Sequence, residues 1–355
     1  MFGLKLKAGA TALSLLTLML VSPAMAGPRV AMVTSEAGLG DKSFNDMMVQ
    51  GMDKAVADLG AEYVVIQPRA ISEFQSTLAR AAGQGFDIII GSSFDMIEPM
   101  KAVAAAFPDQ KFGLVDVSPD PLGANVVSTV TKDWEGSFLV GYIAAKTTKT
   151  GTIGFVGGKD IPIIHRFYIG YYYGAKMANP EVKTIETYTG SFTDPAGGKE
   201  FTLSNINQGA DINFAVAGPT GIGVIEAAKS TNTFAIGVDS NQNDISPGTV
   251  LTSMVKRVDT QAYDMIKSVA DGTFVGNEVK FYGLAEDGVS AAMDENNAGL
   301  IRPEVLAEVD GLKAKLLSGE IVVPNYFDLT AGQAEMGTPP IATPPSIASA
   351  TSLAK

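Results

Sequence analysis

The stretch that links the first apolar run of the chain to its first amphipathic run reads Asp41-Lys42-Ser43-Phe44-Asn45. The apolar residues 29–34 come before it and a helical pattern follows it to residue 59, so the sequence predicts a strand, a turn and a helix. Ser43 is expected to cap this helix together with Asp46. Phe44 can present a flat apolar face at the carboxyl end of the strand, which is where open α/β sheets bind ligands. The stretch therefore predicts one wall of a ligand cleft.

Strands and helices are expected to alternate along most of the chain. The expected strands are residues 29–34, 62–67, 86–91, 111–116, 125–130, 152–156, 184–188, 211–216, 233–238 and 250–253. Helical patterns include residues 44–59, 72–83, 134–145, 162–177 and 259–270. Strands that are apolar throughout and separated by helices are typical of parallel sheets covered on both faces. Because the alternation restarts near residue 152, we expect two doubly wound α/β lobes.

The first 26 residues have the features of a secretory signal peptide. Lys5 and Lys7 precede an apolar run at 8–21 that is too short to span a bilayer, and Ala24-Met25-Ala26 matches a cleavage site. We therefore expect cleavage near Ala26. The sequence contains no cysteine, which excludes disulfides, thiolate metal sites and a lipidated cysteine. These features favour a free periplasmic protein.

The charge balance argues against nucleic acid as a partner. The chain has 26 Lys and Arg against 38 Asp and Glu, a formal net charge of −12. The basic residues are scattered, whereas binding to a phosphate backbone needs a basic patch. The sequence therefore predicts an acidic, soluble surface.

Catalytic and cofactor motifs are absent from the sequence. His165 is the only histidine, which excludes a histidine metal cluster. Gly157-Gly158-Lys159-Asp160 lacks the glycine spacing and the Ser or Thr of a phosphate loop. No Gly-x-Ser-x-Gly elbow is present. We expect no cofactor, no metal and no enzymatic activity.

Polar and aromatic residues recur directly after the expected strands in both halves of the chain. They include Ser35 and Ser93 in the first half, and Gly218 and Asp239 in the second. Each alone is compatible with a helix cap. Their recurrence predicts a cleft between two lobes that suits a neutral ligand with a flat face and several hydroxyls.

An ordered series of motifs resembles the basic membrane protein (BMP) family. The motifs are Asp41-Lys42-Ser43-Phe44-Asn45, Gly136-Ser137-Phe138-Leu139-Val140-Gly141-Tyr142, Gly154-Phe155-Val156-Gly157-Gly158, Ala217-Gly218-Pro219-Thr220-Gly221 and Gly237-Val238-Asp239-Ser240-Asn241-Gln242. The resemblance covers roughly residues 29–288 and implies a substrate-binding protein of an ABC importer. It also implies the type I periplasmic binding fold, similar to ribose-binding proteins, and purine nucleosides as ligands.

The resemblance assigns roles to particular residues. Phe44 matches an aromatic that stacks on the purine, and Asp116 a carboxylate that hydrogen-bonds the base. Asp239 matches the carboxylate that grips the ribose hydroxyls, with Lys256 as the cation beside it. Ser35 departs from the Asp or Asn usual there, which leaves the preferred base open. For the second stacking aromatic we favour Phe192 over Phe167. The expected ligand-binding set is Ser35, Asp41, Phe44, Asn45, Ser93, Asp116, Phe192, Gly218, Asp239 and Lys256.

Together these observations predict a monomeric periplasmic binding protein that closes on adenosine, guanosine or inosine and delivers it to an ABC permease in the inner membrane. Lobe 1 is expected to comprise residues 27–132 and 254–278, and lobe 2 residues 133–253 and 279–329, joined by crossover strands. Residues 330–355 contain two Pro-Pro pairs and are expected to form a flexible tail. Two alternatives are a pentose or another heterocycle as cargo, and a nucleoside hydrolase with Asp116 and Asp239 as acid and base.

Overall fold

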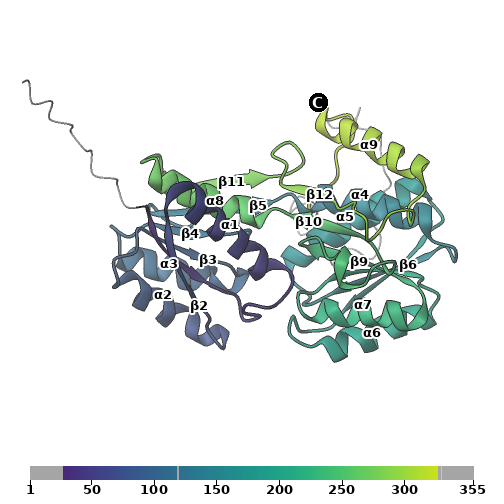
Figure 1. The fold of residues 1–355 in the computed structure, drawn as a ribbon, viewed down its shortest axis with the longest axis horizontal. Helices are drawn as coiled ribbons and strands as arrows, with labels where there is room; N and C mark the ends of the chain where they lie inside the picture. The colour runs from purple at the N-terminus through teal and green to yellow at the C-terminus, as the bar shows by residue number, and fades with distance from the viewer. Residues whose placement is uncertain (1–26, 118–119, 327–328, 330–355) are drawn as a thin grey trace, which may run out of the picture.

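The computed structural model describes residues 27–117, 120–326 and 329. The predicted signal peptide, residues 1–26, and the predicted tail, residues 330–355, lie outside the described residues. Two α/β lobes lie side by side, each built on its own six-stranded sheet (Figure 1). None of the described helices combines the length and apolarity that crossing a membrane requires.

Lobe 1 is a doubly wound parallel sheet. In spatial order its strands are β11 (Glu278–Tyr282), β5 (Val126–Thr131), β4 (Phe112–Leu114), β3 (Ile88–Gly91), β1 (Arg29–Val33) and β2 (Glu62–Ile66). Its helices are α1 (Phe44–Leu59), α2 (Phe74–Ala82), α3 (Ile97–Ala106) and α8 (Val258–Ala270), with short 3₁₀ turns η1 (Ile71–Glu73) and η2 (Phe94–Met96). The parallel pairing confirms the predicted fold class.

Both faces of this sheet are buried, which explains why its central strands are apolar at every position. Val30 and Met32 of β1 pack into a cluster with α1 and α8, whereas Ala31 and Val33 pack on the opposite face with α2 and α3. Successive side chains of a strand point to opposite faces. A strand covered on both sides therefore needs apolar residues without alternation.

Lobe 2 repeats the architecture with one antiparallel edge. Its sheet runs β12 (Val289–Ala291), β10 (Val250–Lys256), β9 (Phe234–Asp239), β8 (Ile212–Val216), β6 (Thr152–Gly157) and β7 (Lys183–Tyr188), with β12 antiparallel to β10. Its helices are α4 (Asp133–Thr147), α5 (Pro162–Ala178), α6 (Pro195–Asn207), α7 (Thr220–Thr231) and α9 (Pro303–Leu317), with the 3₁₀ turn η3 (Asn243–Ile245). Strands β11 and β12 were not predicted from the sequence.

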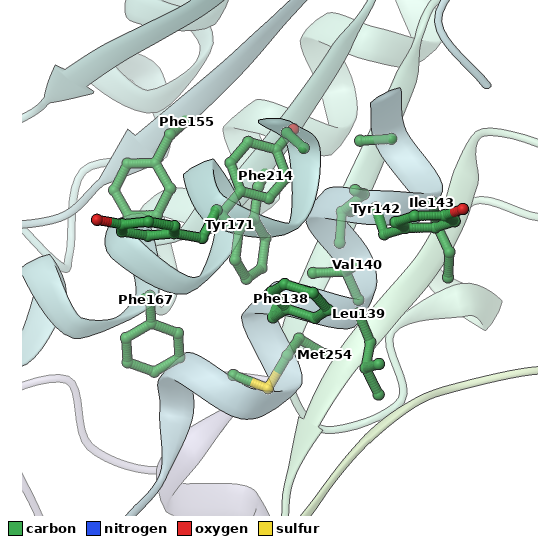
Figure 2. Packing of buried hydrophobic residues seen from close by; sticks show 14 of the residues in the cluster. Phe138, Leu139, Val140, Tyr142, Ile143, Phe155, Phe167, Tyr171, Phe214 and Met254 are labelled. Carbon is green, nitrogen blue, oxygen red and sulfur yellow. The ribbon is translucent and has the colours of Figure 1, made fainter. Parts of the chain in front are cut away.

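Aromatic rings fill the core of lobe 2 between the sheet and helices α4 and α5 (Figure 2). The Phe214 ring lies 5.3 Å from that of Tyr171 and 5.8 Å from that of Phe155. Helices α4 and α5 pack backbone to backbone, because a Cβ at Gly141 would lie 2.1 Å from the Tyr171 carbonyl oxygen and one at Gly174 1.9 Å from that of Phe138. This tight packing holds the start of α5, which carries Arg166 and Phe167, in a fixed place beside the cleft.

The chain passes between the lobes three times, after β5, after β10 and between β11 and β12. Two passages fall later than the expected boundaries at 253/254 and 278/279. Strand β10 continues in the sheet of lobe 2 to Lys256, and β11 adds Glu278–Tyr282 to the sheet of lobe 1. The expected boundaries are therefore corrected to about 257 and to 283–288, since pairing with the neighbouring strand decides which lobe each residue joins.

Candidate functional site

A cavity with about 810 Å³ of empty space, part of it open solvent, lies between the lobes at the carboxyl ends of β1, β3, β4, β8, β9 and β10. All ten residues of the expected ligand-binding set line this cavity, as does Phe167. The fold thus brings together residues that lie at or after the ends of seven strands, β1, β3, β4, β7, β8, β9 and β10.

The turn before α1 is held by Asp41, and this corrects the expected cap. The Asp41 carboxylate accepts hydrogen bonds from the backbone N–H groups of Ser43, Asn45 and Asp46. The Ser43 hydroxyl makes no cap bond and instead donates to Asp239 of the other lobe. Asp41 can satisfy three N–H groups at once because its side chain points back into the helix start. The capping role predicted for Ser43 was therefore wrong.

Asn45 shapes the cavity wall from behind. Its Nδ2 donates to Ser35 Oγ and to Asp41 Oδ2, both at 2.8 Å, and its Oδ1 accepts from the Ser35 N–H at 3.1 Å and from Ser92 Oγ at 3.2 Å. Asn45 is fully buried. An amide side chain with both groups paired to the protein acts mainly as a brace, so Asn45 and Asp41 position the wall on which Ser35 lies.

Four phenylalanines line the cavity from the two lobes. Phe44 of α1, Phe94 of η2 and Phe192 before α6 are half-buried, whereas Phe167 is 2% exposed. Phe192 packs on Gly158, where an added Cβ would lie 2.2 Å from the ring. The glycine at 158 is therefore what gives Phe192 room at the cavity wall.

Five buried charges form an ionic cluster at the base of the cavity. Lys256 Nζ lies 2.5 Å from Asp116 Oδ2, 3.5 Å from Asp133 Oδ1 and 3.7 Å from Asp239 Oδ1. Arg166 Nη2 lies 2.6 Å from Asp133 Oδ2 and 3.3 Å from Asp116 Oδ1. Lys256 was expected beside Asp239, but its nearest carboxylate is Asp116. Asp116 of lobe 1 therefore forms ion pairs with two cations of lobe 2, Lys256 and Arg166.

The pKa values in this cluster are set by burial and by the two cations. Burial alone would raise the pKa of Asp116, but Lys256 and Arg166 outweigh it and hold the pKa below its usual value. Burial and the neighbouring Asp116 raise the pKa of Asp133 to about 7. Burial also raises the pKa of Asp239, although Lys256 and Ser43 oppose it. For Lys256, three carboxylates overcome burial and raise its pKa.

Asp116 and Asp239 occupy matching positions in the two lobes. Each has a left-handed backbone, with φ of 57° and 64°, at the end of its strand. Such conformations are uncommon for residues other than glycine and gather at functional sites. The Asp116 side chain is fully buried and also accepts from the Thr131 N–H at 2.8 Å. Asp239 keeps more acceptor capacity, because its one hydrogen bond within the described residues comes from Ser43.

Several polar contacts bridge the mouth of the cleft. Lys159 of lobe 2 pairs with Glu36 of lobe 1. Ser240 Oγ and Gln242 Nε2 donate to the Lys42 carbonyl oxygen at 2.8 and 2.9 Å. Together with the bond from Ser43 to Asp239, these contacts join the two lobes across the cleft.

Four charged residues of the site were not predicted from the sequence: Glu36, Asp133, Lys159 and Arg166. Lys159 and Glu36 look like solvated charges in sequence, since nothing local pairs residues more than a hundred positions apart. Arg166 carried a usable signal, because it is a charge inside the otherwise apolar start of a helix. A buried arginine needs an anionic partner, and here Asp116 and Asp133 provide it.

The raised pKa of Asp133 predicts a pH dependence of stability. A carboxyl group with a higher pKa in the folded state stabilises the fold fully at low pH, and the contribution is lost as pH rises from about 4, its unfolded value, towards 7. The lowered pKa of Asp116 acts in a separate window, below about pH 4. We expect Asp133→Asn to flatten the decline in unfolding free energy between pH 5 and 7, measured by urea titration. Equal slopes in both proteins would contradict this.

Comparison with known proteins identifies the family. The sequence profile of the Bmp family, described as ABC transporter substrate-binding protein PnrA-like, matches residues 29–326. The chain belongs to the Bmp family. Basic membrane protein A of Borreliella afzelii is 34% identical over 84% of this chain and 91% of its own length. An uncharacterised lipoprotein of Pyrococcus abyssi is 34% identical over 74% of this chain and 68% of its own length.

A solved structure supports the same conclusion. An ABC transporter solute-binding protein of Aeropyrum pernix K1 has a TM-score of 0.79 and 32% identity, covering 87% of this chain and 96% of that one. The predicted family and fold are thus confirmed. As a Bmp-family member the protein is a substrate-binding protein of an ABC transporter. Among the described residues no group of His, Asp or Glu could hold a metal ion.

Proposed function

We propose that the protein binds a purine nucleoside in the cavity and delivers it to an ABC permease in the inner membrane. The observation that carries this proposal is the pairing of aromatic rings from opposite lobes, Phe44 on one side and Phe192 on the other, with Asp239 nearby. Flat heterocycles bind between aromatic faces. A nucleoside joins such a ring to a sugar with several hydroxyls.

The chemistry of Asp239 supports the sugar half of the proposal. One of its carboxylate oxygens accepts from Ser43, and the other lies 3.7 Å from Lys256. Asp239 therefore retains lone pairs for hydroxyl groups of a ligand. We assign it to the ribose, with Phe44 and Phe192 on the base. Asp116, whose oxygens hold Lys256, Arg166 and Thr131, would contribute mainly by placing Lys256.

We also propose that the mature protein is free in the periplasm. The support is the signal-peptide pattern in residues 1–26 together with the absence of cysteine, since lipid attachment needs a cysteine. In this respect the chain differs from the relative that is named a lipoprotein.

Calorimetry with purified protein tests the proposed cargo. We expect adenosine, guanosine or inosine to bind with micromolar affinity or better, which corresponds to about −8 kcal/mol. Ribose, arabinose and free amino acids serve as comparison ligands. If a pentose gives heat and no purine nucleoside does, the pentose alternative replaces the nucleoside.

The same titration on Phe44→Ala tests the stacking role. Loss of one base-aromatic contact, worth roughly 1 to 3 kcal/mol, should weaken nucleoside binding by about one to two orders of magnitude. Phe281→Ala is the matched control, because Phe281 is 45% exposed on β11 and does not line the cavity. Unchanged affinity in Phe44→Ala with a large fall in melting temperature would assign Phe44 to the core.

A further inference from the structure

We infer that the cavity selects 6-oxopurine nucleosides such as inosine and guanosine over adenosine, because the Ser35 and Ser93 hydroxyls both donate hydrogen bonds to the ligand. The inference rests on the proposed function and adds the class of base. It follows from hydrogen bonds that determine which way each serine hydroxyl can point.

The first hydroxyl is oriented by Asn45. The Ser35 N–H, which can only donate, and the Asp41 carboxylate, which can only accept, allow one arrangement of the Asn45 amide. Asn45 Oδ1 lies 3.1 Å from the Ser35 nitrogen, and Asn45 Nδ2 lies 2.8 Å from Asp41 Oδ2. The reversed amide would set two donors against each other at Ser35 and two acceptors against each other at Asp41. Nδ2 therefore donates to Ser35 Oγ at 2.8 Å. Ser35 Oγ must accept this bond, and its own proton is left for the cavity.

The second hydroxyl is oriented by the backbone. Ser93 Oγ accepts from the Asp95 N–H at 3.2 Å, at the start of η2. An N–H can only donate, so the Ser93 proton is also left over. No hydrogen bond from the Ser35 or Ser93 hydroxyl to another residue occurs in the described part of the chain. Both side chains are half-buried and line the cavity.

The two serines follow neighbouring strands of the lobe 1 sheet. Strands β1 and β3 are parallel, with Val33 paired to Gly91. Ser35 and Ser93 each come two residues after these partners, at equivalent positions. The ends of adjacent strands are about 4.8 Å apart, and both serines line the cavity just beyond these ends. We therefore infer that one edge of a base can reach both hydroxyls.

One edge of a 6-oxopurine matches this pair of donors. Guanine presents two adjacent acceptors there, N7 and O6, whereas adenine presents the N7 acceptor and the N6 amino donor. Hypoxanthine has the same N7 and O6 pair as guanine. With adenosine, one serine would have to accept from the amino group through its remaining lone pair, which turns its own proton away from the base and leaves that proton without an acceptor there. Binding of adenosine is therefore weaker by the cost of one poorly paired donor.

Calorimetry with a set of nucleosides tests the inference on the wild-type protein. We expect inosine and guanosine to bind about tenfold or more tightly than adenosine. We also expect 7-deazaguanosine, which lacks the N7 acceptor, to bind about tenfold more weakly than guanosine. These comparisons need no variant and so do not depend on the folding of one.

The double variant Ser35→Ala, Ser93→Ala assigns the preference to the two hydroxyls. We expect it to bind all three nucleosides with affinities within about threefold of one another. Ser76→Ala, an exposed serine of α2, is the matched control and should keep the wild-type preference. Equal or tighter binding of adenosine by the wild type, or a preference that survives in the double variant, overturns the inference and leaves the nucleoside assignment intact. If no nucleoside binds at all, the proposed function fails instead.

Discussion

Replacement of Lys256 by Met is expected to lower the free energy of unfolding at pH 7 by about 3 to 5 kcal/mol, the usual cost of removing one partner from a buried ion pair. Lys256 is 3% exposed and lies within 4 Å of three buried carboxylates. Without it, Arg166 is the one cation left to offset Asp116, Asp133 and Asp239 in the described cluster. Urea unfolding measures the loss directly.

The loss should shrink as the pH falls. Burial raises the pKa of both Asp133 and Asp239, and removal of Lys256 raises each further, so both take up protons readily in the variant. At pH 5 the destabilisation is therefore smaller than at pH 7. Lys132→Met is the control: its salt bridge to Glu135 is partly exposed at 3.7 Å and should contribute at most about 1 kcal/mol. If the Lys256→Met protein is as stable as the wild type at pH 7, Lys256 does not offset the buried carboxylates of the ionic cluster.

Asp239→Ala is expected to weaken ribonucleoside binding by about a hundredfold. A carboxylate that accepts from two neighbouring hydroxyls makes two charge-assisted bonds, each worth roughly 1.5 to 3 kcal/mol. A 2′-deoxynucleoside lacks one of these hydroxyls and should bind the wild type about tenfold more weakly. In Asp239→Ala this difference should disappear, because the group that detects the hydroxyl is gone. Calorimetry with both ligands on both proteins gives the four affinities required.

Ser43→Ala separates ribose recognition from lobe closure. Its hydroxyl donates to Asp239 across the cleft, so Asp239→Ala removes a bond between the lobes as well as a ligand acceptor. Ser43→Ala removes the same bond but keeps the carboxylate, and should weaken ribo and deoxy ligands equally. If the ribose preference persists in Asp239→Ala, the sugar is held by other residues and Asp239 serves closure alone.

The layers of the fold could be predicted from local sequence. Runs such as Val30 to Val33 are apolar at every position, and this pattern arises when both faces of a strand are covered. The helix from Phe44 to Leu59 was predicted with the bounds it has in the structure. Edge strands carry a weaker pattern: β11 and β12 are short and partly exposed, so periodicity did not identify them.

The positions of the site residues could also be predicted, because they follow strands and the carboxyl ends of parallel strands meet at one edge of a sheet. Their partners could not. Ser43 has the sequence context of a helix cap, yet its hydroxyl binds Asp239, 196 residues away. Lys256 was placed beside Asp239 but lies closest to Asp116.

The sequence by itself determined the two doubly wound lobes, the family and the strand ends that line the cleft, since each depends on patterns within a few neighbouring residues. Only the tertiary structure decided how the charges and hydroxyls pair. Asp116 with Lys256 and Arg166, Lys159 with Glu36, and the Ser43 hydroxyl with Asp239 are choices among several chemically equivalent partners. Which partner each group takes depends on how the two lobes pack against each other, and local sequence carries no information about that packing.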